Sequence, residues 1–201
     1  TDYRSLTAWS GLEFQPDGRI VVNWEPSLSL GRIWDYEGRF QDEWATLAFE
    51  GDLKHQTHLE IEGLVSRERF REKMFPGIRR ATLSVSTRPS ETIGIGSEIE
   101  FGRSIYRTFD PEEQPYLGRM VEAALDANLK LMSRLTLGTG LAYERMKEPQ
   151  GDALAYDGWI LRNRLNFQIN REASLRVVTE YDSFDERFAF EPLLTYRLNA
   201  F

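Results

Sequence analysis

The sequence predicts an all-β protein: an antiparallel up-and-down transmembrane β-barrel with about 10–11 strands in this chain. Three observations lead to this fold class. Apolar and polar residues alternate with a period of two, as they do along a strand with one wet face. The alternating segments run to about ten residues, whereas strands in soluble sheets usually have about five or six. Short and long connections also alternate along the chain, which is typical of outer-membrane barrels.

The segment 134–144 shows the alternation most clearly. One set of alternate side chains is mostly apolar: Leu135, Leu137, Thr139, Leu141 and Tyr143. The other set is small or charged: Thr136, Gly138, Gly140, Ala142 and Glu144. A segment with this pattern is expected to form a strand that meets an apolar environment on one face and water on the other.

Each predicted strand is bounded by a turn signal or a polar loop. The strands are expected at 6–15, 19–29, 44–53, 57–65, 78–87, 92–103, 118–130, 134–146, 159–170, 173–183 and from about 188 onward. Short turns are expected at Pro16-Asp17-Gly18, Lys54-His55-Gln56, Arg88-Pro89-Ser90-Glu91, Met132-Ser133 and Arg171-Glu172. Long connections are expected at 30–43, at 66–77, around Asp110-Pro111 and at 147–158. No linker divides the chain, so we expect one β-barrel domain over residues 1–201.

The end of the chain argues against a complete barrel. Asn199 and Arg197 share the face of Phe201, whereas an outer-membrane assembly signal would place apolar residues there. An eleventh strand would also give an odd count, and bacterial barrels of one chain usually have an even one. We therefore expect an incomplete part of a larger barrel, closed by further strands or by another chain. Because the chain begins at Thr1 without a signal-peptide pattern, we expect a mature product, a fragment or part of something longer.

Composition excludes several classes of function. The chain has no cysteine, which excludes disulfides and thiolate metal sites. Its net charge of −7 argues against a nucleic-acid partner, since phosphate contacts need a basic surface. No apolar run approaches the roughly 20 residues of a membrane helix, and the mean hydropathy is −0.48. Barrel strands need only alternate apolar residues, so a membrane location remains open.

Charged side chains recur in mid-strand on the face opposite the apolar one. Burying an unpaired charge costs several kcal/mol, so this face is expected to line a water-filled or salt-bridged lumen. The predicted acidic arc comprises Glu60, Glu62, Glu98, Glu100, Glu122 and Asp126. The predicted basic arc comprises Arg162, Arg164, Arg176 and Arg197. One hypothesis is a transverse field that orients or filters polar solutes; the other is a set of salt bridges that plugs the interior.

Other candidate sites are few. An aromatic belt at the membrane interface is predicted from residues toward strand ends: Trp24, Trp44, Tyr143, Trp159 and Tyr181. The acidic residues Asp182, Asp185 and Glu186 are metal candidates, although a solvated loop is the favoured interpretation. His55 and His58 fall in or beside a turn and form no catalytic constellation. We therefore expect no cofactor and do not expect an enzyme, while leaving catalysis open.

The last third of the chain resembles a family of large bacterial outer-membrane proteins. The resemblance lies in the run 163–181, Asn-Arg-Leu-Asn-Phe-Gln-Ile-Asn-Arg-Glu-Ala-Ser-Leu-Arg-Val-Val-Thr-Glu-Tyr, and in 193–199, Leu-Leu-Thr-Tyr-Arg-Leu-Asn. The Arg88-Pro89-Ser90 turn also fits such barrels. Members of that family carry an N-terminal carbohydrate-binding-module (family 9-like) domain before a C-terminal barrel of largely uncharacterised function. The resemblance implies glycan handling by a longer protein but transfers no catalytic residue.

These observations predict a porin-like barrel in the bacterial outer membrane. It is expected to act as a membrane anchor or conduit and to support carbohydrate binding or uptake in the full-length protein. The expected partners are outer-membrane lipid, a second chain or further strands that close the barrel, and glycan, with no nucleic acid. The alternative is a soluble antiparallel β-domain that binds a ligand or partner through its charged face. A barrel hydrolase is a third interpretation.

Overall fold

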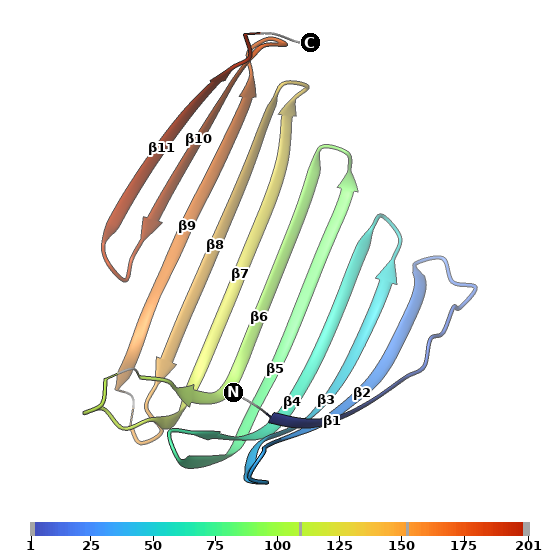
Figure 1. Cartoon of the computed structure of the whole chain (residues 1–201). Coiled ribbons are helices and arrows are strands. Elements are labelled where there is room, and N and C mark those ends of the chain that lie inside the picture. The colour runs from blue at the N-terminus through green and yellow to red at the C-terminus, as the bar shows by residue number, and fades with distance from the viewer. Residues whose placement is uncertain (1–2, 109, 152, 199–201) are drawn as a thin grey trace.

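The protein is an open antiparallel sheet in which the strands follow one another in sequence order (Figure 1). The computed structural model describes residues 3–108, 110–151 and 153–198. Over these residues eleven strands form one sheet, each strand hydrogen-bonded to the next. The predicted fold class is confirmed: all-β, antiparallel and up-and-down. The described residues contain no helix that is long and apolar enough to span a membrane.

Most strands are longer than the sequence pattern predicts. Their bounds are β1 (Tyr3–Gly11), β2 (Val21–Asp35), β3 (Phe40–Leu53), β4 (Thr57–Phe70), β5 (Lys73–Ser90), β6 (Ile93–Tyr106), β7 (Tyr116–Met132), β8 (Leu135–Lys147), β9 (Leu154–Gln168), β10 (Ala173–Asp182) and β11 (Arg187–Tyr196). The sheet curves so that the edge strands β1 and β11 lie nearer the viewer in Figure 1 than the paler strands between them. The view is therefore into the concave face.

The connections lie at two opposite ends of the sheet (Figure 1). At the proximal end, where β1 begins, they are 36–39, 71–72, 107–115, 148–153 and 183–186. At the distal end they are 12–20, 54–56, 91–92, 133–134 and 169–172. The expected strict alternation of long and short connections is wrong in detail, because 30–43 and 66–77 are mostly strand.

Ion pairs between neighbouring strands explain why these polar segments stay in the sheet. Glu43 on β3 pairs with Arg32 on β2 and with Arg67 on β4, where the Arg67 Nε to Glu43 Oε2 distance is 2.6 Å. Each charge is thus matched across the ladder, and the backbone hydrogen bonds continue past the apolar part of the strand.

The predicted positions of Asn199 and Phe201 lie outside the described residues.

The strand register sorts the side chains into two faces. Ile61, Leu83, Ile99 and Ala123 are successive cross-strand partners on β4 to β7 and share one face. Ile61, Leu83 and Ile99 are exposed, whereas side chains on the opposite face are half-buried; because side chains crowd together on the inside of a curved sheet, we assign the exposed face as the convex one. Convex-face apolar side chains are widely exposed, with Phe101 at 53%. The neighbouring row Glu62, Thr82, Glu100 and Glu122 is half-buried on the concave face. The surface that a globular protein would bury is therefore the exposed one here.

A small apolar core lies at the proximal end. Phe75, Ile78 and Ile105 are buried together, and Phe70 and Leu117 pack against them. The tip of the β4–β5 hairpin is tied to the β6–β7 connection by Arg71, whose Nη1 donates to the carbonyl oxygen of Asp110 at 2.9 Å. Arg107 also donates two hydrogen bonds to Glu68, at 2.7 and 2.6 Å. This carboxylate raises the pKa of the Arg107 guanidinium, so the pair stays charged.

Candidate functional site on the concave face

Two adjacent rows of the concave face form a band of carboxylates. In one row Glu25, Glu50 and Glu60 are successive partners on β2 to β4, and Glu98 follows beyond Ser84. In the next row Glu100, Glu122 and Glu144 are successive partners on β6 to β8, and Glu62 lies beyond Thr82. We call these residues the carboxylate band: Glu25, Glu50, Glu60, Glu62, Glu98, Glu100, Glu122 and Glu144. Like charges directly opposite one another destabilise a sheet, so the band needs solvent or cations beside it.

One arginine compensates part of the band. Arg80 on β5 donates from Nη1 to Glu100 Oε1 at 3.1 Å, and the Thr82 hydroxyl donates to Glu100 Oε2 at 3.2 Å. Arg80 lies one row nearer the proximal end, where Gly102 is its partner on β6. Among the described residues, ion pairs provide these eight carboxylates with one guanidinium partner, that of Arg80, so a strongly negative strip runs along the concave face.

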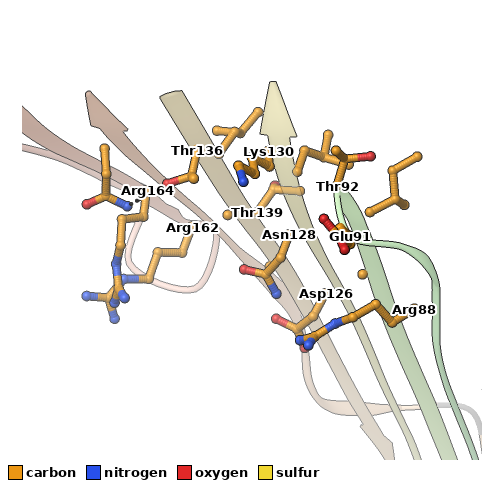
Figure 2. Close-up of a pocket in the computed structure, with 17 residues that line it drawn as sticks. Arg88, Glu91, Thr92, Asp126, Asn128, Lys130, Thr136, Thr139, Arg162 and Arg164 are labelled. Atoms are coloured by element: carbon orange, nitrogen blue, oxygen red, sulfur yellow. Dashed lines mark hydrogen bonds between the residues drawn. The ribbon is translucent and has the colours of Figure 1, made fainter. Parts of the chain in front are cut away.

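Toward the distal end the band gives way to a pocket floored by glycines. The pocket has a volume of about 620 Å³ and is lined by residues of β5 to β9 (Figure 2). Gly94, Gly138 and Gly140 lie on its floor. Its polar side chains include Arg88, Asp126, Asn128, Lys130, Arg162 and Arg164. We call it the glycine-lined pocket.

The glycines create the space in this pocket. Gly140 lies between Asp126 on β7 and Arg162 on β9, and Gly138 lies between Asn128 and Arg164 in the next row. A Cβ at Gly140 would be 2.9 Å from Asp126 Oδ1, and a Cβ at Gly138 would be 3.3 Å from Asn128 Oδ1. The acceptor side chains of β7 therefore lean over β8 and face the arginines of β9 across an open floor. Figure 2 shows Arg162 and Arg164 side by side, with Arg88 pointing toward Asp126 from the opposite side.

The pocket offers donors and acceptors within one small volume. Arginine and lysine side chains only donate hydrogen bonds, an aspartate only accepts them, and an asparagine does both. Such a set suits solutes rich in hydroxyl groups or carrying an anionic group, and the planar guanidinium groups of the arginines form directional hydrogen bonds. The adjoining carboxylate band repels anions, so the two surfaces favour different parts of a polar solute.

The structure divides the predicted acidic arc between the two surfaces. Five of its members belong to the carboxylate band: Glu60, Glu62, Glu98, Glu100 and Glu122. Asp126 lies instead in the glycine-lined pocket, beside Gly140.

The predicted basic arc is also divided. Arg162 and Arg164 line the pocket, whereas Arg176 lies one row further distal, opposite Asn166 and Leu193. Arg197 follows the end of β11, and its backbone N–H donates to the Glu172 carbonyl at 2.9 Å. The arc also contains carboxylates. Arg162 pairs with Glu180 at 3.7 Å, and Glu191, which is the cross-strand partner of Val178, lies on the same face. Positive and negative side chains are thus mixed on this arc of the concave face. The transverse field stays a hypothesis.

Sequence reasoning missed several residues of the site. Glu25, Glu50 and Glu144 belong to the band, and Arg88 and Lys130 to the pocket. In β2 the concave-face residues are odd-numbered, whereas in β4 to β10 they are even-numbered. Counting the residues in each turn, and so following the parity from strand to strand, is the signal that would have found Glu25.

Four of the five predicted belt residues share the convex face. Trp24 stacks on Phe14 near the distal end at 4.2 Å between ring centroids, and Trp159 packs on Tyr181 near the proximal end at 5.1 Å. Tyr143 is the cross-strand partner of Trp159. Trp44 lies on the concave face, because its partner Ser66 belongs to the concave row and its ring covers Gly31. The belt itself stays a prediction.

The predicted metal candidates act as turn residues. Asp182 Oδ1 accepts hydrogen bonds from the backbone N–H groups of Phe184, at 2.8 Å, and Asp185, at 3.4 Å. Asp185 also lies 3.5 Å from Arg187. Within the described ranges there is no group of three or more histidines, cysteines or carboxylates that could hold a metal ion.

No family model matches this chain, and no curated protein matches it. Among solved structures it is similar to the NanC porin, with 9% sequence identity, a TM-score of 0.46 and 98% of each chain covered. It is also similar to the translocator domain of the autotransporter NalP from Neisseria meningitidis, with 10% identity, a TM-score of 0.30, 98% of this chain and 80% of that chain covered. At these scores neither likeness identifies a family or a function. The resemblance to barrels with a carbohydrate-binding domain stays a prediction.

Proposed function

We propose that this chain forms part of the wall of a bacterial outer-membrane β-barrel that acts as a membrane anchor and a conduit for polar solutes. One observation carries the proposal: the apolar face of the sheet is the exposed, convex face, and the charged face is concave. Leaving a large apolar side chain in water costs about 1.5–3 kcal/mol relative to burying it. A convex face covered with such side chains is stable against lipid and unstable in water.

The height of the apolar face supports this proposal. On β6 the convex residues from Ile93 to Phe101 are apolar or small, and Arg103 follows. Eight steps of about 3.3 Å give about 26 Å along the strand, or about 20 Å along the membrane normal for a tilt of about 40°. Barrels in outer membranes carry an apolar band about 25 Å tall. The band on this sheet is therefore about four fifths as tall as the band of such barrels.

The concave face supports the conduit. Water in a lumen stabilises the carboxylate band, which a dry interior could not hold. The glycine-lined pocket supplies donors and acceptors for sugar hydroxyl groups, in agreement with the carbohydrate uptake that the family resemblance implies.

Fluorescence quenching by brominated lipids tests the membrane orientation. Two variants are reconstituted into vesicles, one retaining only Trp159 and the other only Trp44, with the remaining tryptophans replaced by Phe. We expect strong quenching of Trp159 on the convex face and weak quenching of Trp44 on the concave face. Equal quenching, or a chain that is monodisperse without detergent, would contradict the proposal and favour a soluble β-domain.

Planar-bilayer recordings test the conduit. We expect single-channel currents with a preference for cations, and a current that added maltohexaose reduces. The variant Gly138→Val/Gly140→Val, which fills the pocket, is expected to conduct but to lose the sugar effect. The control Gly63→Val changes a convex-face glycine whose added Cβ would meet only a backbone oxygen at 4.0 Å. A chain that inserts and carries no current would remove the conduit and leave the anchor.

A further inference from the structure

The convex face carries a row of cations at the proximal border of its apolar band. Arg79, Arg103, Arg119 and Lys147 are successive cross-strand partners on β5 to β8. Like charges directly opposite one another destabilise an antiparallel pair. Such a row in a chain of net charge −7 runs against its overall composition. Within this row, Arg79 and Arg103 are directly opposite each other, so this pair would be stabilised by an anion outside the sheet.

Two members of this row lack a counter-charge within the sheet. Among residues 3–108, 110–151 and 153–198, no carboxylate forms an ion pair with Arg79 or Arg103. Arg119 is held in place by a hydrogen bond from its Nη2 to the Gly151 carbonyl, at 2.8 Å. The guanidinium groups of Arg79 and Arg103 can thus meet an anion at the surface.

An apolar groove leads directly to these cations. On β1 to β4 the same cross-strand row consists of Ala8, Leu30, Ala45 and Val65, and Val65 is the partner of Arg79. These residues line a cavity of about 780 Å³ on the convex face, and the ion-paired side chains of Arg32, Glu43 and Arg67 lie at its border. The alanines leave space between the larger side chains, so the groove is open toward the surroundings of the sheet.

We propose that this surface binds a membrane lipid with an anionic phosphate headgroup. The phosphate contacts Arg79 and Arg103, and an acyl chain lies in the groove over Ala8 and Ala45. Planar guanidinium groups match phosphate oxygens and form charge-assisted hydrogen bonds with them. The groove provides the apolar contact that a free anion would not use. This inference rests on the proposed membrane location of the convex face.

Lipid retention by the full chain tests the proposal. The protein is reconstituted into vesicles of equal parts phosphatidylglycerol and phosphatidylcholine, and then transferred to mild detergent. Native mass spectrometry counts the retained lipids, and protease protection in the vesicles measures insertion separately. The variants are Arg79→Gln/Arg103→Gln, which removes the cations, and Ala45→Phe, which fills the groove. The control Arg134→Gln/Arg171→Gln makes the same charge change in distal connections.

We expect preferential retention of phosphatidylglycerol by the wild type and the control. Arg79→Gln/Arg103→Gln should weaken this retention about tenfold, the loss of roughly one charge-assisted contact. Ala45→Phe should reduce the retention of both lipids. Normal insertion with equal retention of the two lipids, or displacement of phosphatidylglycerol by inorganic phosphate alone, would overturn this inference and leave the proposed function intact. Failure to insert in any vesicle would overturn both.

Discussion

At the scale of single residues, glycines serve two different purposes in this sheet. Gly138 and Gly140 leave space for the side chains of β7, and the nearest atom that an added Cβ would meet at each is the end of a side chain, Asn128 or Asp126. Gly102 instead allows two backbones to approach closely. Its φ is +153°, and an added Cβ would lie 2.0 Å from the backbone oxygen of Arg79. Substitution of Gly138 or Gly140 is therefore expected to affect binding in the pocket. Substitution of Gly102 is expected to affect folding.

Gly102→Ala is expected to destabilise the folded chain by about 2 kcal/mol or more, because neither backbone can yield without breaking the β5–β6 ladder. Chemical unfolding in detergent, followed by tryptophan fluorescence, measures the loss. The matched control Gly63→Ala should be neutral or slightly stabilising, since alanine is favoured over glycine in a strand by about 0.5–1 kcal/mol. Equal stabilities of the two variants would show that Gly102 is not under backbone constraint.

Arg80 provides a positive charge beside the carboxylate band, through its hydrogen bond to Glu100. Replacing it in Arg80→Gln removes the hydrogen bond to Glu100 and is expected to cost about 1–3 kcal/mol. The double variant Arg80→Gln/Glu100→Gln should recover part of this loss, because it removes the carboxylate that was left alone. Unfolding free energies of the two single variants and the double variant give the coupling. A coupling of zero would mean that solvent, not Arg80, compensates Glu100.

At the scale of elements, the sequence pattern located the strands well in the middle of the sheet. The segments 92–103 and 134–146 lie close to β6 and β8, because their apolar alternation covers nearly the whole strand. β4 and β5 extend well beyond their predicted ends at residues 65 and 78. There Arg67, Glu68 and neighbouring charges interrupt the pattern, and cross-strand ion pairs replace apolar contacts. Such pairs depend on the register between neighbouring strands, and the sequence of one strand does not determine that register.

The same reasoning explains what could be predicted of the candidate site. The period of two predicts the charged face of each strand, and it therefore identifies Glu62, Glu100 and Arg162. The glycine-lined pocket requires knowing that Gly140 lies between Asp126 and Arg162 on adjacent strands. That placement depends on the lengths of the intervening turns. The position of Trp44 near a strand end predicts a belt residue, but its pairing with Ser66 puts it on the concave face.

The β4–β5 hairpin is expected to loosen at its tip in Glu68→Gln. Glu68 accepts two hydrogen bonds from Arg107, and both side chains are partly exposed, at 25% and 47%. Losing this pair should cost about 0.5–1 kcal/mol and make amide exchange in residues 107–115 about two- to fivefold faster. Asp185→Asn, at a more exposed pair with Arg187, serves as the control and should leave exchange in 107–115 unchanged. Unaltered exchange in Glu68→Gln would show that the apolar core at Phe75 and Ile78 holds the tip without the ion pair.

At the scale of the whole molecule, charge is unevenly distributed over the two faces of the sheet. The concave face holds the carboxylate band, while the convex face holds the cationic row Arg79, Arg103, Arg119 and Lys147 beyond its apolar band. In the proposed orientation the carboxylate band and the arginines of the glycine-lined pocket meet the lumen, and Arg79 and Arg103 meet lipid headgroups. The net charge of −7 therefore describes neither surface.

The two edges of the sheet pose a geometric problem. Neighbouring strands are antiparallel throughout, so β1 and β11 run in the same direction, and the sheet could close on itself only through a parallel pair. Over the described residues these strands are not paired with each other. Bare backbone groups at an edge in lipid cost several kcal/mol each. We therefore expect that other strands or another chain cover both edges.

Cross-linking tests this expectation directly, because the chain has no native cysteine. Thr7→Cys/Ala189→Cys joins the two edge strands only if β1 meets β11 within one molecule. Glu180→Cys/Ala189→Cys joins the paired strands β10 and β11, where these residues are cross-strand partners, and serves as the positive control. With a short bis-maleimide applied in vesicles, we expect an intramolecular cross-link in the control and none between the edges. Equal cross-linking of both pairs would mean that the chain closes on its own and that its edges need no partner.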